Sequence, residues 1–389
     1  MDATNLVTLR TARPGIIDRG VVWAPESEAA IRAGAPVAIG VSGGKDSCAL
    51  AIATVEALDA IGHTGPRVLI HSDLGRVEWR DSLPTCERLA ERLGLELIVV
   101  HRAAGDMMDR WLTRWANNVA RFASLSCVKV ILPWSTPSMR FCTSELKTAV
   151  ICRELVRRFP GQVIVSAAGI RREESAKRRK APIEKKQNKL TSTPRRRDLW
   201  TTGVDWNPII EWTEADVRAF LAARGFDLHE GYTVYGMSRI SCAYCIMATL
   251  ADLTASASCP DNVAIYRVMV DLEIVSTFAF QGSRWLGDVA PHLLTEAQHA
   301  GLAAAKLAAA AREAAEARIP EHLLYVKGWP VVMPTEAEAE LLAEVRRDVA
   351  ATLGLDVECV TAAEVLARYA ALMALKASKA AADEDDLDN

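Results

Sequence analysis

The chain has 389 residues, of which 50% are hydrophobic and 24% charged, and its formal net charge is −3 at pH 7. This composition is typical of globular proteins, the length allows two or three domains, and the charge is too small to indicate a partner. The N-terminus lacks the basic and apolar pattern of a signal peptide, and no apolar run reaches membrane-spanning length. We therefore expect a cytoplasmic protein with no membrane partner.

The predicted elements alternate between strands and helices over the first half of the chain. Short apolar runs bounded by turn residues predict strands within 36–41, 67–75, 95–101 and 161–175. Helical patterns cover 26–33, 46–60, 80–94, 106–123 and 143–158. This alternation predicts an α/β fold with a mostly parallel, doubly wound sheet and helices on both faces. In such sheets ligands bind outside the carboxyl ends of the strands.

The second half of the chain changes character. Residues 171–197 hold twelve Lys and Arg against three Glu, and we expect a loop or a mobile insertion there. Thr213, with Asp216 three residues later, has the pattern of a helix N-cap. Further helices are predicted in the Ala-rich stretch 303–317 and over 335–379. The acidic end of the chain is typical of a disordered tail.

The stretch SGGKDS joins the first predicted strand to the following helix; its residues are Ser42, Gly43, Gly44, Lys45, Asp46 and Ser47. Such a turn presents unpaired backbone N–H groups at the positive end of the helix dipole, which favours an anion. The two glycines allow close approach of the main chain, the lysine adds positive charge, and the hydroxyls can donate hydrogen bonds. The aspartate can cap the helix or approach a phosphate-bound magnesium ion. The turn therefore predicts a phosphate site, although its spacing is not that of a Walker A loop.

This loop and further motifs occur in an order that resembles the phosphoadenylyl-sulfate (PAPS) reductase family and its PP-loop relatives, the N-type ATP pyrophosphatases. The further motifs are HSDLG (71–75), RFCTSELK (140–147), GIRREES (169–175), WTEADV (212–217) and GMSRISCAYC (236–245). The resemblance covers residues 36–290. It implies an adenine nucleotide as the ligand and places Asp73, Gly169 and Arg239 in the binding site. It also implies that Lys147, Arg171 and Arg172, together with Lys45, stabilise the charge that develops as pyrophosphate leaves.

Two departures from the reductases bear on the reaction. The thioredoxin-using reductases carry a C-terminal E-C-G-[IL]-H element, which is absent here, where Cys359 stands in DVECVTA. The reductases also tend to lose the G-G-K-D core that ATP-splitting members keep and that this chain retains. The resemblance thus implies an enzyme that uses ATP and Mg²⁺ to adenylate an acceptor for sulfur transfer, as in DNA phosphorothioation and tRNA thiolation. A sulfur donor protein is then an expected partner.

Two other functions stay open. One is a reductase that acts on PAPS or adenylyl sulfate and releases sulfite, which the family resemblance favours. The other is a non-catalytic module that binds a nucleotide or a nucleic acid. Fold alone does not choose among these three functions.

The nine cysteines are an odd number in a chain with a cytosolic composition, so a disulfide scaffold is not expected. Cys242 and Cys245 have the spacing of two ligands to one metal or cluster. Cys142 comes from the R-x-C motif of the family, and Cys259 precedes a proline, a context found in cluster ligands. Four thiolates suit a [4Fe–4S] cluster, which we favour, or zinc. A redox or structural pair is the remaining alternative, and Cys259 is the weakest of the four proposed ligands.

The basic loop at 171–197 has three interpretations. It can neutralise the phosphates of a nucleic acid, it can close over a triphosphate, or it can be a solvated loop. Trp200 lies beside its arginines; it would allow base stacking, or it belongs equally well to the core. Together these predictions divide the chain into an N-terminal segment (1–35), a PP-loop nucleotide-binding domain with the basic loop (36–200), a cysteine-bearing substrate region (201–290), a helical extension (291–380) and an acidic tail (381–389).

Overall fold

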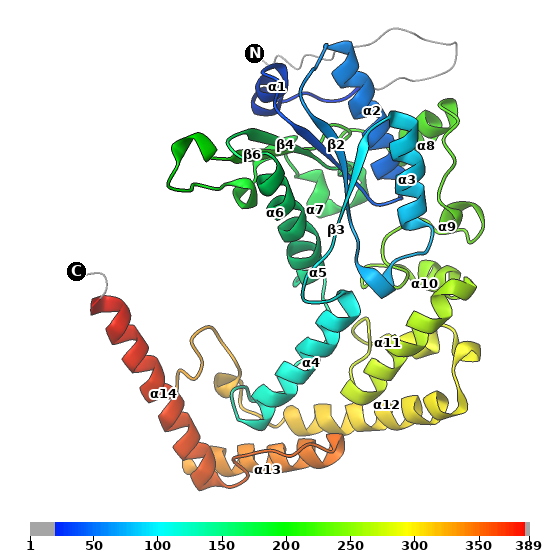
Figure 1. The fold of residues 1–389 in the computed structure, drawn as a ribbon. Helices are drawn as coiled ribbons and strands as arrows, with labels where there is room; N and C mark the ends of the chain where they lie inside the picture. Colours follow the sequence, from blue (N-terminus) through cyan, green and yellow to red (C-terminus); the bar gives the residue numbers. More distant parts are fainter. Residues whose placement is uncertain (1–19, 386–389) are drawn as a thin grey trace. The chain divides into compact units, whose positions relative to one another are not determined.

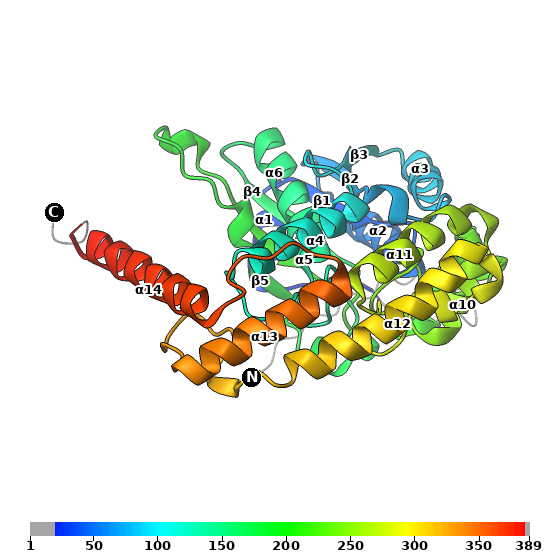
Figure 2. The same cartoon turned by 90° about the horizontal axis from the view of Figure 1, so that it is seen from below.

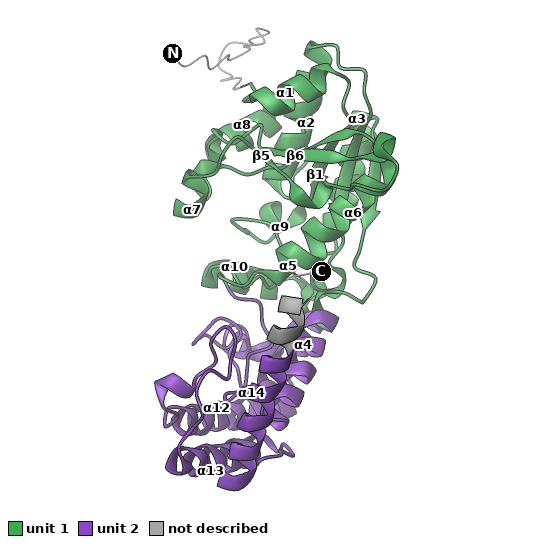
Figure 3. Cartoon of the chain, turned by 90° about the vertical axis from the view of Figure 1, so that its left-hand side faces the viewer, with its two compact units in different colours: residues 1–108, 137–263 green, residues 109–136, 264–389 purple. Residues whose placement is uncertain are grey.

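The computed structural model of the chain describes residues 20–385. It separates into two compact units (Figure 3). The first comprises residues 1–108 and 137–263, and the second comprises residues 109–136 and 264–389.

The first unit is built around a six-stranded sheet with the order β3-β2-β1-β4-β6-β5 (Figure 1). The strands are β1 (Val37–Val41), β2 (Arg67–Ser72), β3 (Glu96–Val100), β4 (Val163–Ala167), β5 (Glu184–Lys186) and β6 (Thr202–Trp206). All neighbouring strands are parallel except β5, which pairs antiparallel with β6. The predicted mostly parallel α/β sheet is thus confirmed.

Helices cover both faces of this sheet. Those of the first unit are α1 (Pro25–Arg32), α2 (Lys45–Ala60), α3 (Ser82–Leu93), α5 (Phe141–Thr143), α6 (Ala149–Arg158), α7 (Ala176–Arg179), α8 (Glu214–Ala223), α9 (Glu230–Thr233) and α10 (Leu250–Ala257). Side chains alternate along a strand, so β1 supplies two cores. Val37 and Ile39 pack in the core that includes α2 and α8, whereas Ala38 packs in the core that includes α6. Burial on both faces explains why β1 is continuously apolar.

Two parts of this unit differ from the sequence-based expectation. The strands β5 and β6 were not predicted, and the basic loop contains ordered elements: α7, β5 and short 3₁₀ turns at Asn188–Leu190 and Arg197–Leu199. Pairing with β6 orders this segment, so it is not a plain loop. The predicted cap of α8 is confirmed, because the Thr213 hydroxyl accepts from the Asp216 N–H at 3.1 Å and the Asp216 carboxylate accepts from the Thr213 N–H at 2.7 Å.

The second unit is helical. It contains most of α4 (Met107–Ala123) and α11 (Val263–Ser276), with α12 (Glu296–Glu316), α13 (Glu336–Leu353) and α14 (Ala362–Asp385). The helices α12, α13 and α14 follow one another, and each packs on the next (Figure 2). Helix α14 continues to Asp385, so the predicted acidic tail begins as helix, while residues 386–389 and 1–19 lie outside the described part of the chain.

Two buried charged residues hold this helical unit together through backbone groups. The guanidinium of Arg346 donates to the carbonyls of Phe122, Ala123, Glu358 and Cys359 at 2.5–3.1 Å. The carboxylate of Glu273 accepts three backbone N–H groups at 2.7–3.0 Å, from Phe280, Leu286 and Gly287. Among the described residues, no helix is long and apolar enough to cross a bilayer.

Candidate nucleotide-binding site

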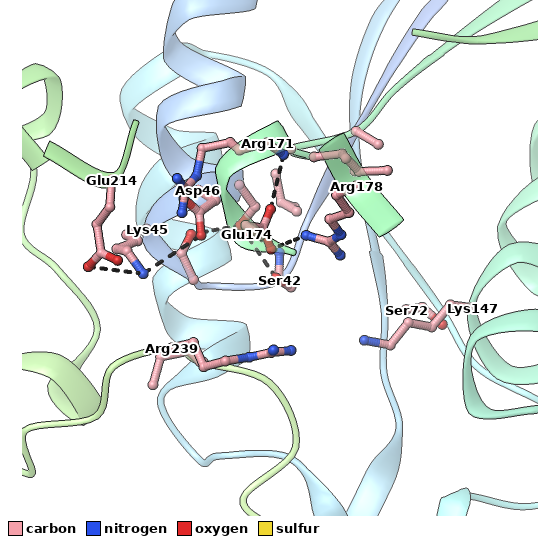
Figure 4. A pocket seen from close by; sticks show the side chains of 18 of the residues that line it. Ser42, Lys45, Asp46, Ser72, Lys147, Arg171, Glu174, Arg178, Glu214 and Arg239 are labelled. Atoms are coloured by element: carbon pink, nitrogen blue, oxygen red, sulfur yellow. Dashed lines mark hydrogen bonds and ion pairs between the residues drawn. The ribbon is translucent and has the colours of Figure 1, made fainter. Parts of the chain in front are cut away.

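A cavity of about 620 Å³ lies at the carboxyl ends of β1, β2 and β4, where the sequence predicts the ligand (Figure 4). Its lining comes from the ends of β1 and β2, the first turn of α2, the segment after β4, the region around the start of α6, the residues Glu214 and Tyr232, and a strap formed by residues 238–240. The predicted residues among its lining are Ser42, Gly44, Lys45, Asp46, Ser47, Lys147, Gly169, Arg171 and Arg239.

Gly43 is held behind this lining in a conformation that favours glycine. Its φ is +72°, and a Cβ added here would lie 2.9 Å from the carbonyl oxygen of Ser82 and 3.3 Å from the ring of His229. The His229 ring is buried, and burial lowers its pKa to about 4, so the ring stays neutral. Its Nδ1 accepts the N–H of Gly231 at 2.9 Å, and its Nε2 lies 3.4 Å from the hydroxyl of Ser82. These contacts fix the backbone against which the loop turns.

Lys45 is buried at the start of α2, with only 2% of its surface exposed. Its ammonium donates to the carbonyl of Ser238 at 3.0 Å and lies 3.7 Å from the Glu214 carboxylate and 3.8 Å from that of Asp46. The cation therefore links the loop to the strap, and a bound phosphate would compete with the Ser238 carbonyl for it.

Arg171 is the second cation held by carboxylates. Its Nε donates to Asp46 at 2.7 Å and a terminal nitrogen donates to Glu173 at 2.9 Å. Burial by itself would lower the pKa of Arg171, but the neighbouring carboxylates, Asp46 first, outweigh burial and raise that pKa. The residue stays charged, and it orients Asp46 at the rim of the cavity.

Lys147 and Arg239 differ from these two residues. Both side chains line the cavity, and Figure 4 shows them extending toward each other from opposite walls. Within the described residues, no carboxylate forms an ion pair with either one. Two unpaired cations that converge on one space favour an anionic ligand between them.

Tyr232 joins the loop to the strap. Its hydroxyl accepts the N–H of Lys45 at 3.2 Å and that of Ile240 at 3.1 Å. Burial raises the pKa of the Tyr232 phenol, which therefore stays protonated. The strap is held on its other side by Asp252, which accepts the N–H of Ser238 at 2.7 Å and its hydroxyl at 2.8 Å.

Sequence reasoning did not single out several members of this cavity. These are Ser72, Glu173, Glu174, Arg178, Glu214, Tyr232 and Ser238. Glu174 and Arg178 form an ion pair at the rim. Both stand within or beside the predicted GIRREES motif and the basic loop, which is the signal that could have identified them. Tyr232 begins the stretch YTVYGMSRISCAYC (232–245), which contains the predicted GMSRISCAYC motif and Ser238, and this stretch is the signal that could have identified both residues.

Two predicted residues lie elsewhere. The side chain of Arg172 pairs with Glu211 and donates to the carbonyl of Ala181, and it is not part of the cavity lining. Asp73 is likewise outside the lining, and its carboxylate closes a turn by accepting the N–H of Gly75 at 2.7 Å. Their roles at the nucleotide therefore stay predictions.

The four predicted metal ligands do not form one ligand set in this structure. Burial raises the pKa of Cys242; nearby Cys245 and Cys142 raise it further, and Lys147 opposes them, so these groups lie close to one another. The thiol of Cys259, by contrast, is buried and hydrogen-bonds with the hydroxyl of Tyr235. In the described part of the chain, no three or more His, Cys, Asp or Glu side chains are arranged to hold a metal ion. As placed, the residues do not fit a cluster, and metal ligation stays a prediction.

A histidine connects the cysteine segment to β1. The ring of His71 lies 3.1 Å from the carbonyl of Val41 through Nδ1 and 3.1 Å from the Glu78 carboxylate through Nε2. Burial lowers the pKa of His71, but hydrogen bonds to Cys86 and Glu78 outweigh burial and raise it to about 10. The ring is therefore charged, and Glu78 in turn pairs through its backbone with Cys242. These contacts give His71 a structural role between β1 and the cysteine segment.

Comparison with known proteins identifies the family. The sequence profile of the phosphoadenosine phosphosulfate reductase domain matches residues 36–248, which is more than half of the chain. The chain belongs to this family. The PAPS reductase match includes β1 to β6, the cavity and the Cys242–Cys245 pair, and it confirms the resemblance seen in the motifs. No curated protein matches the chain.

Solved structures also show partial similarity. A PAPS reductase from Candida auris in complex with phosphate is 11% identical, with a TM-score of 0.33, over 53% of this chain and 80% of that chain. The U34-tRNA thiolase NcsA from Methanococcus maripaludis, with its [4Fe-4S] cluster, is 13% identical, with a TM-score of 0.34, over 70% of this chain and 72% of that chain.

Proposed function

We propose that this PAPS reductase-family chain is an enzyme that binds Mg-ATP and adenylates an acceptor before sulfur transfer. The observation that carries the proposal is the intact Ser42–Ser47 loop, which forms one wall of a cavity whose other walls carry the unpaired cations Lys147 and Arg239. A triphosphate needs both parts: backbone amides at a helix N-terminus and cations that can face its remaining oxygens.

In the proposed reaction, an oxygen of the acceptor attacks the α-phosphorus of ATP. The bond between this phosphorus and the bridging oxygen to the β-phosphate breaks, and pyrophosphate leaves with the bonding electrons. A sulfur nucleophile supplied by a donor protein then displaces AMP from the activated acceptor. Where that nucleophile is a persulfide, the acceptor is first joined to the donor through an S–S bond, and a second thiol of the donor cleaves this bond, which leaves the thiolated acceptor and a disulfide on the donor. Each step conserves charge and atoms and needs no external oxidant at the nucleotide.

The residues have separate tasks in this proposal. Lys45 and the amides of the first turn of α2 hold the phosphates, while Lys147 and Arg239 stabilise the negative charge that develops on pyrophosphate. Arg171 orients Asp46, the carboxylate at the rim that would reach a magnesium ion carried by the triphosphate. Bound magnesium would neutralise phosphate charge, since this ion is usually held by one or two carboxylates together with substrate phosphates.

A reductase that cleaves PAPS or adenylyl sulfate to sulfite is the second candidate function. The family match favours it. The retained G-G-K-D core and the absence of the E-C-G-[IL]-H element from the sequence favour ATP instead. The same cations would bind the sulfate group in a reductase, so the lining alone does not choose between the two.

Calorimetric titration of the anaerobically purified full chain with Mg-ATP and, separately, with PAPS tests the proposal. We expect tight binding of Mg-ATP and at least about tenfold weaker binding of PAPS. The opposite preference, with sulfite release from PAPS and a thiol, would make the reductase the function. Binding of ATP with no release of pyrophosphate in the presence of any acceptor would support a non-catalytic nucleotide-binding module.

A further inference from the structure

The basic arm, defined here as residues 176–200, projects from the edge of the sheet formed by β5 and β6 (Figure 1). It is anchored at three places. β5 pairs with β6, Ser192 pairs with Thr201, and the Leu190 side chain is fully buried in the core beneath α6. Because the arm has a fixed base, its exposed side chains are presented in a defined arrangement.

The glutamates near and within the arm all have partners in the first unit. All three glutamates between 171 and 197 bind groups of the first unit. Glu173 binds Arg171 and the N–H of Glu214, whereas Glu174 binds Arg178 and the N–H of Arg171. Both oxygens of Glu184 accept N–H groups of the first turn of α1, at 3.0 and 2.7 Å. Glu173 and Glu184 are therefore turned toward the rest of the domain, whereas Glu174 pairs with Arg178 and Asp198 pairs with Arg196, so only part of the arm is neutralised.

Most cations of the arm have no carboxylate partner among the described residues. Seven of them are exposed, and among the described residues no carboxylate pairs with them: Lys177, Arg179, Lys180, Lys186, Lys189, Arg195 and Arg197. A group of exposed Lys and Arg without carboxylate partners on an ordered segment is the electrostatic pattern of a surface that binds a polyanion.

The last residue of the arm is an aromatic one, Trp200. Trp200 is 47% exposed, which is unusual for so large an apolar group. Its indole N–H donates to the carbonyl of Pro194 at 3.0 Å, and the Arg197 guanidinium lies 5.5 Å from its ring centroid. The ring is therefore held in place with part of its surface open. An open indole face beside cations is a stacking platform for an unpaired base.

The arm begins at the cavity. Arg178 lies on α7, within the arm, and also lines the cavity beside Glu174. Arg178 thus places one cation of the arm at the cavity where the nucleotide phosphates are proposed to bind.

We propose that the basic arm binds single-stranded nucleic acid and presents one of its nucleotides to the cavity as the acceptor. This inference rests on the proposed function for its second half only, since binding by the arm does not require ATP. Single strands are selected because stacking on Trp200 needs a base that is free of its pairing partner, whereas duplex DNA or RNA offers mainly phosphates. RNA and DNA share this chemistry, and the test separates them.

Fluorescence anisotropy with labelled oligonucleotides tests the arm. The full chain, without ATP, is titrated with single-stranded RNA, single-stranded DNA and the matching duplexes at several salt concentrations. We expect one of the single strands to bind at least about tenfold more tightly than any duplex. A preference for RNA would indicate contacts to the 2′-hydroxyl. Equal affinity for single strands and duplexes, or no binding, would overturn the proposal.

Four variants separate the contribution of base stacking from that of phosphate contacts. Trp200→Ala should weaken binding about tenfold and leave the salt dependence unchanged, while Trp200→Phe should recover part of the loss. Replacing Lys177, Lys186 and Arg195 together with Ala should lower the slope of log affinity against log salt by about 2, since each phosphate contact contributes about 0.7 for single strands. Arg157→Ala, which removes a cation that is paired with Glu154 on α6, is the matched control and should change neither quantity.

Failure of this inference differs from failure of the proposed function. Tight Mg-ATP binding without nucleic-acid binding would remove the arm proposal alone. Nucleic-acid binding that depends on Trp200, with no ATP binding, would remove adenylation and leave the arm proposal standing. Equal binding of heparin or poly-glutamate with no effect of Trp200→Ala would show an unspecific cationic surface and overturn the stacking platform. Unchanged thermal melting of each variant verifies that the fold is intact.

Discussion

The two units use charge in opposite ways. In the second unit, Arg346 and Glu273 are buried, and backbone carbonyls and N–H groups satisfy them. In the first unit, Lys147 and Arg239 enter a cavity and, within the described residues, have no carboxylate partner. A charge enclosed by backbone partners stabilises a fold, whereas a cation left open in a cavity is available to a ligand. Substitution of an enclosed charge should therefore change the free energy of unfolding, whereas substitution of a cation that is open to the cavity should change the affinity for the ligand.

Lys45 should give the largest effect, because it belongs to both kinds. It binds the Ser238 carbonyl in the fold and would bind a phosphate in the reaction. We expect Lys45→Ala to reduce pyrophosphate release about 1000-fold or more, while circular dichroism shows a folded protein. Undiminished release by this variant would contradict the assignment of the loop.

Arg346→Leu should change stability and leave the site intact. The substitution removes the guanidinium donor from four carbonyls, of which those of Phe122 and Ala123 keep a backbone N–H donor, and it should lower the free energy of unfolding of the second unit by about 3 kcal/mol or more. Urea unfolding measures the loss, and Mg-ATP affinity below the transition should stay within about twofold of the parent. The neighbouring Arg347, which is exposed and pairs with Glu340, provides the control: Arg347→Leu should cost less than about 1 kcal/mol.

Glu273 should make the second unit sensitive to pH. Burial is the largest cause that raises the pKa of this carboxyl to about 7, from a model-peptide value of 4.5. The folded state therefore binds its proton more tightly than the unfolded state does. This part of the stability is fully present below about pH 4.5 and is lost as pH rises through about 7, by about 3 kcal/mol in total.

Urea unfolding at a series of pH values from about 5 to 8 measures this loss. Glu273→Gln keeps an acceptor oxygen and removes the titration, so its stability should fall less over the same range. An equal fall in the parent and the variant would show that other groups cause the pH dependence.

Lys147→Ala and Arg239→Ala should have the opposite signature to Arg346→Leu. Each should weaken Mg-ATP binding by about 10- to 100-fold, because a cation facing phosphate oxygens is lost. The free energy of unfolding should change by less than about 0.5 kcal/mol, since no ion pair is broken. Calorimetry and urea unfolding check the two parts. A large loss of stability with unchanged affinity would show that the side chains are structural.

Tyr232→Phe should give the smallest effect, and it should lower both the free energy of unfolding and the affinity for Mg-ATP. Removing the hydroxyl leaves the N–H groups of Lys45 and Ile240 without their acceptor, and we expect a loss of about 1–2 kcal/mol in stability. Mg-ATP affinity should fall a few-fold because the strap with Arg239 is less firmly held. Tyr235→Phe, which removes a hydroxyl bound to Cys259, is the control and should leave the affinity unchanged.

The parts that the sequence predicts correctly depend on neighbouring residues. The loop at 42–47 combines an apolar strand, glycines and a helix start in one short stretch, so its role is local. The strand β6 was missed because TGVDW is short and contains Asp205, and its conformation depends on pairing with β4 across a long separation. Tyr232 was missed for the same reason, since its partners lie on α2 and on the strap.

Neighbouring residues can also mislead. Arg171 and Arg172 are adjacent, and we expected both in the site. Arg171 has an extended backbone, with φ −123° and ψ 140°, so successive side chains point in different directions. Arg171 reaches Asp46, whereas Arg172 reaches Glu211. A motif identifies which residues stand together in the chain, but the backbone conformation decides which of them face the cavity.

The division of the second unit between residues 109–136 and 264–389 has a consequence for synthesis of the chain. The first piece leaves the ribosome long before the second, yet Phe122 and Leu125 are buried in a core made largely of residues from α13 and α14. These apolar side chains therefore stay exposed while the intervening residues are translated. Such delayed pairing slows folding and favours aggregation, which makes this stretch a natural binding site for a chaperone on the nascent chain.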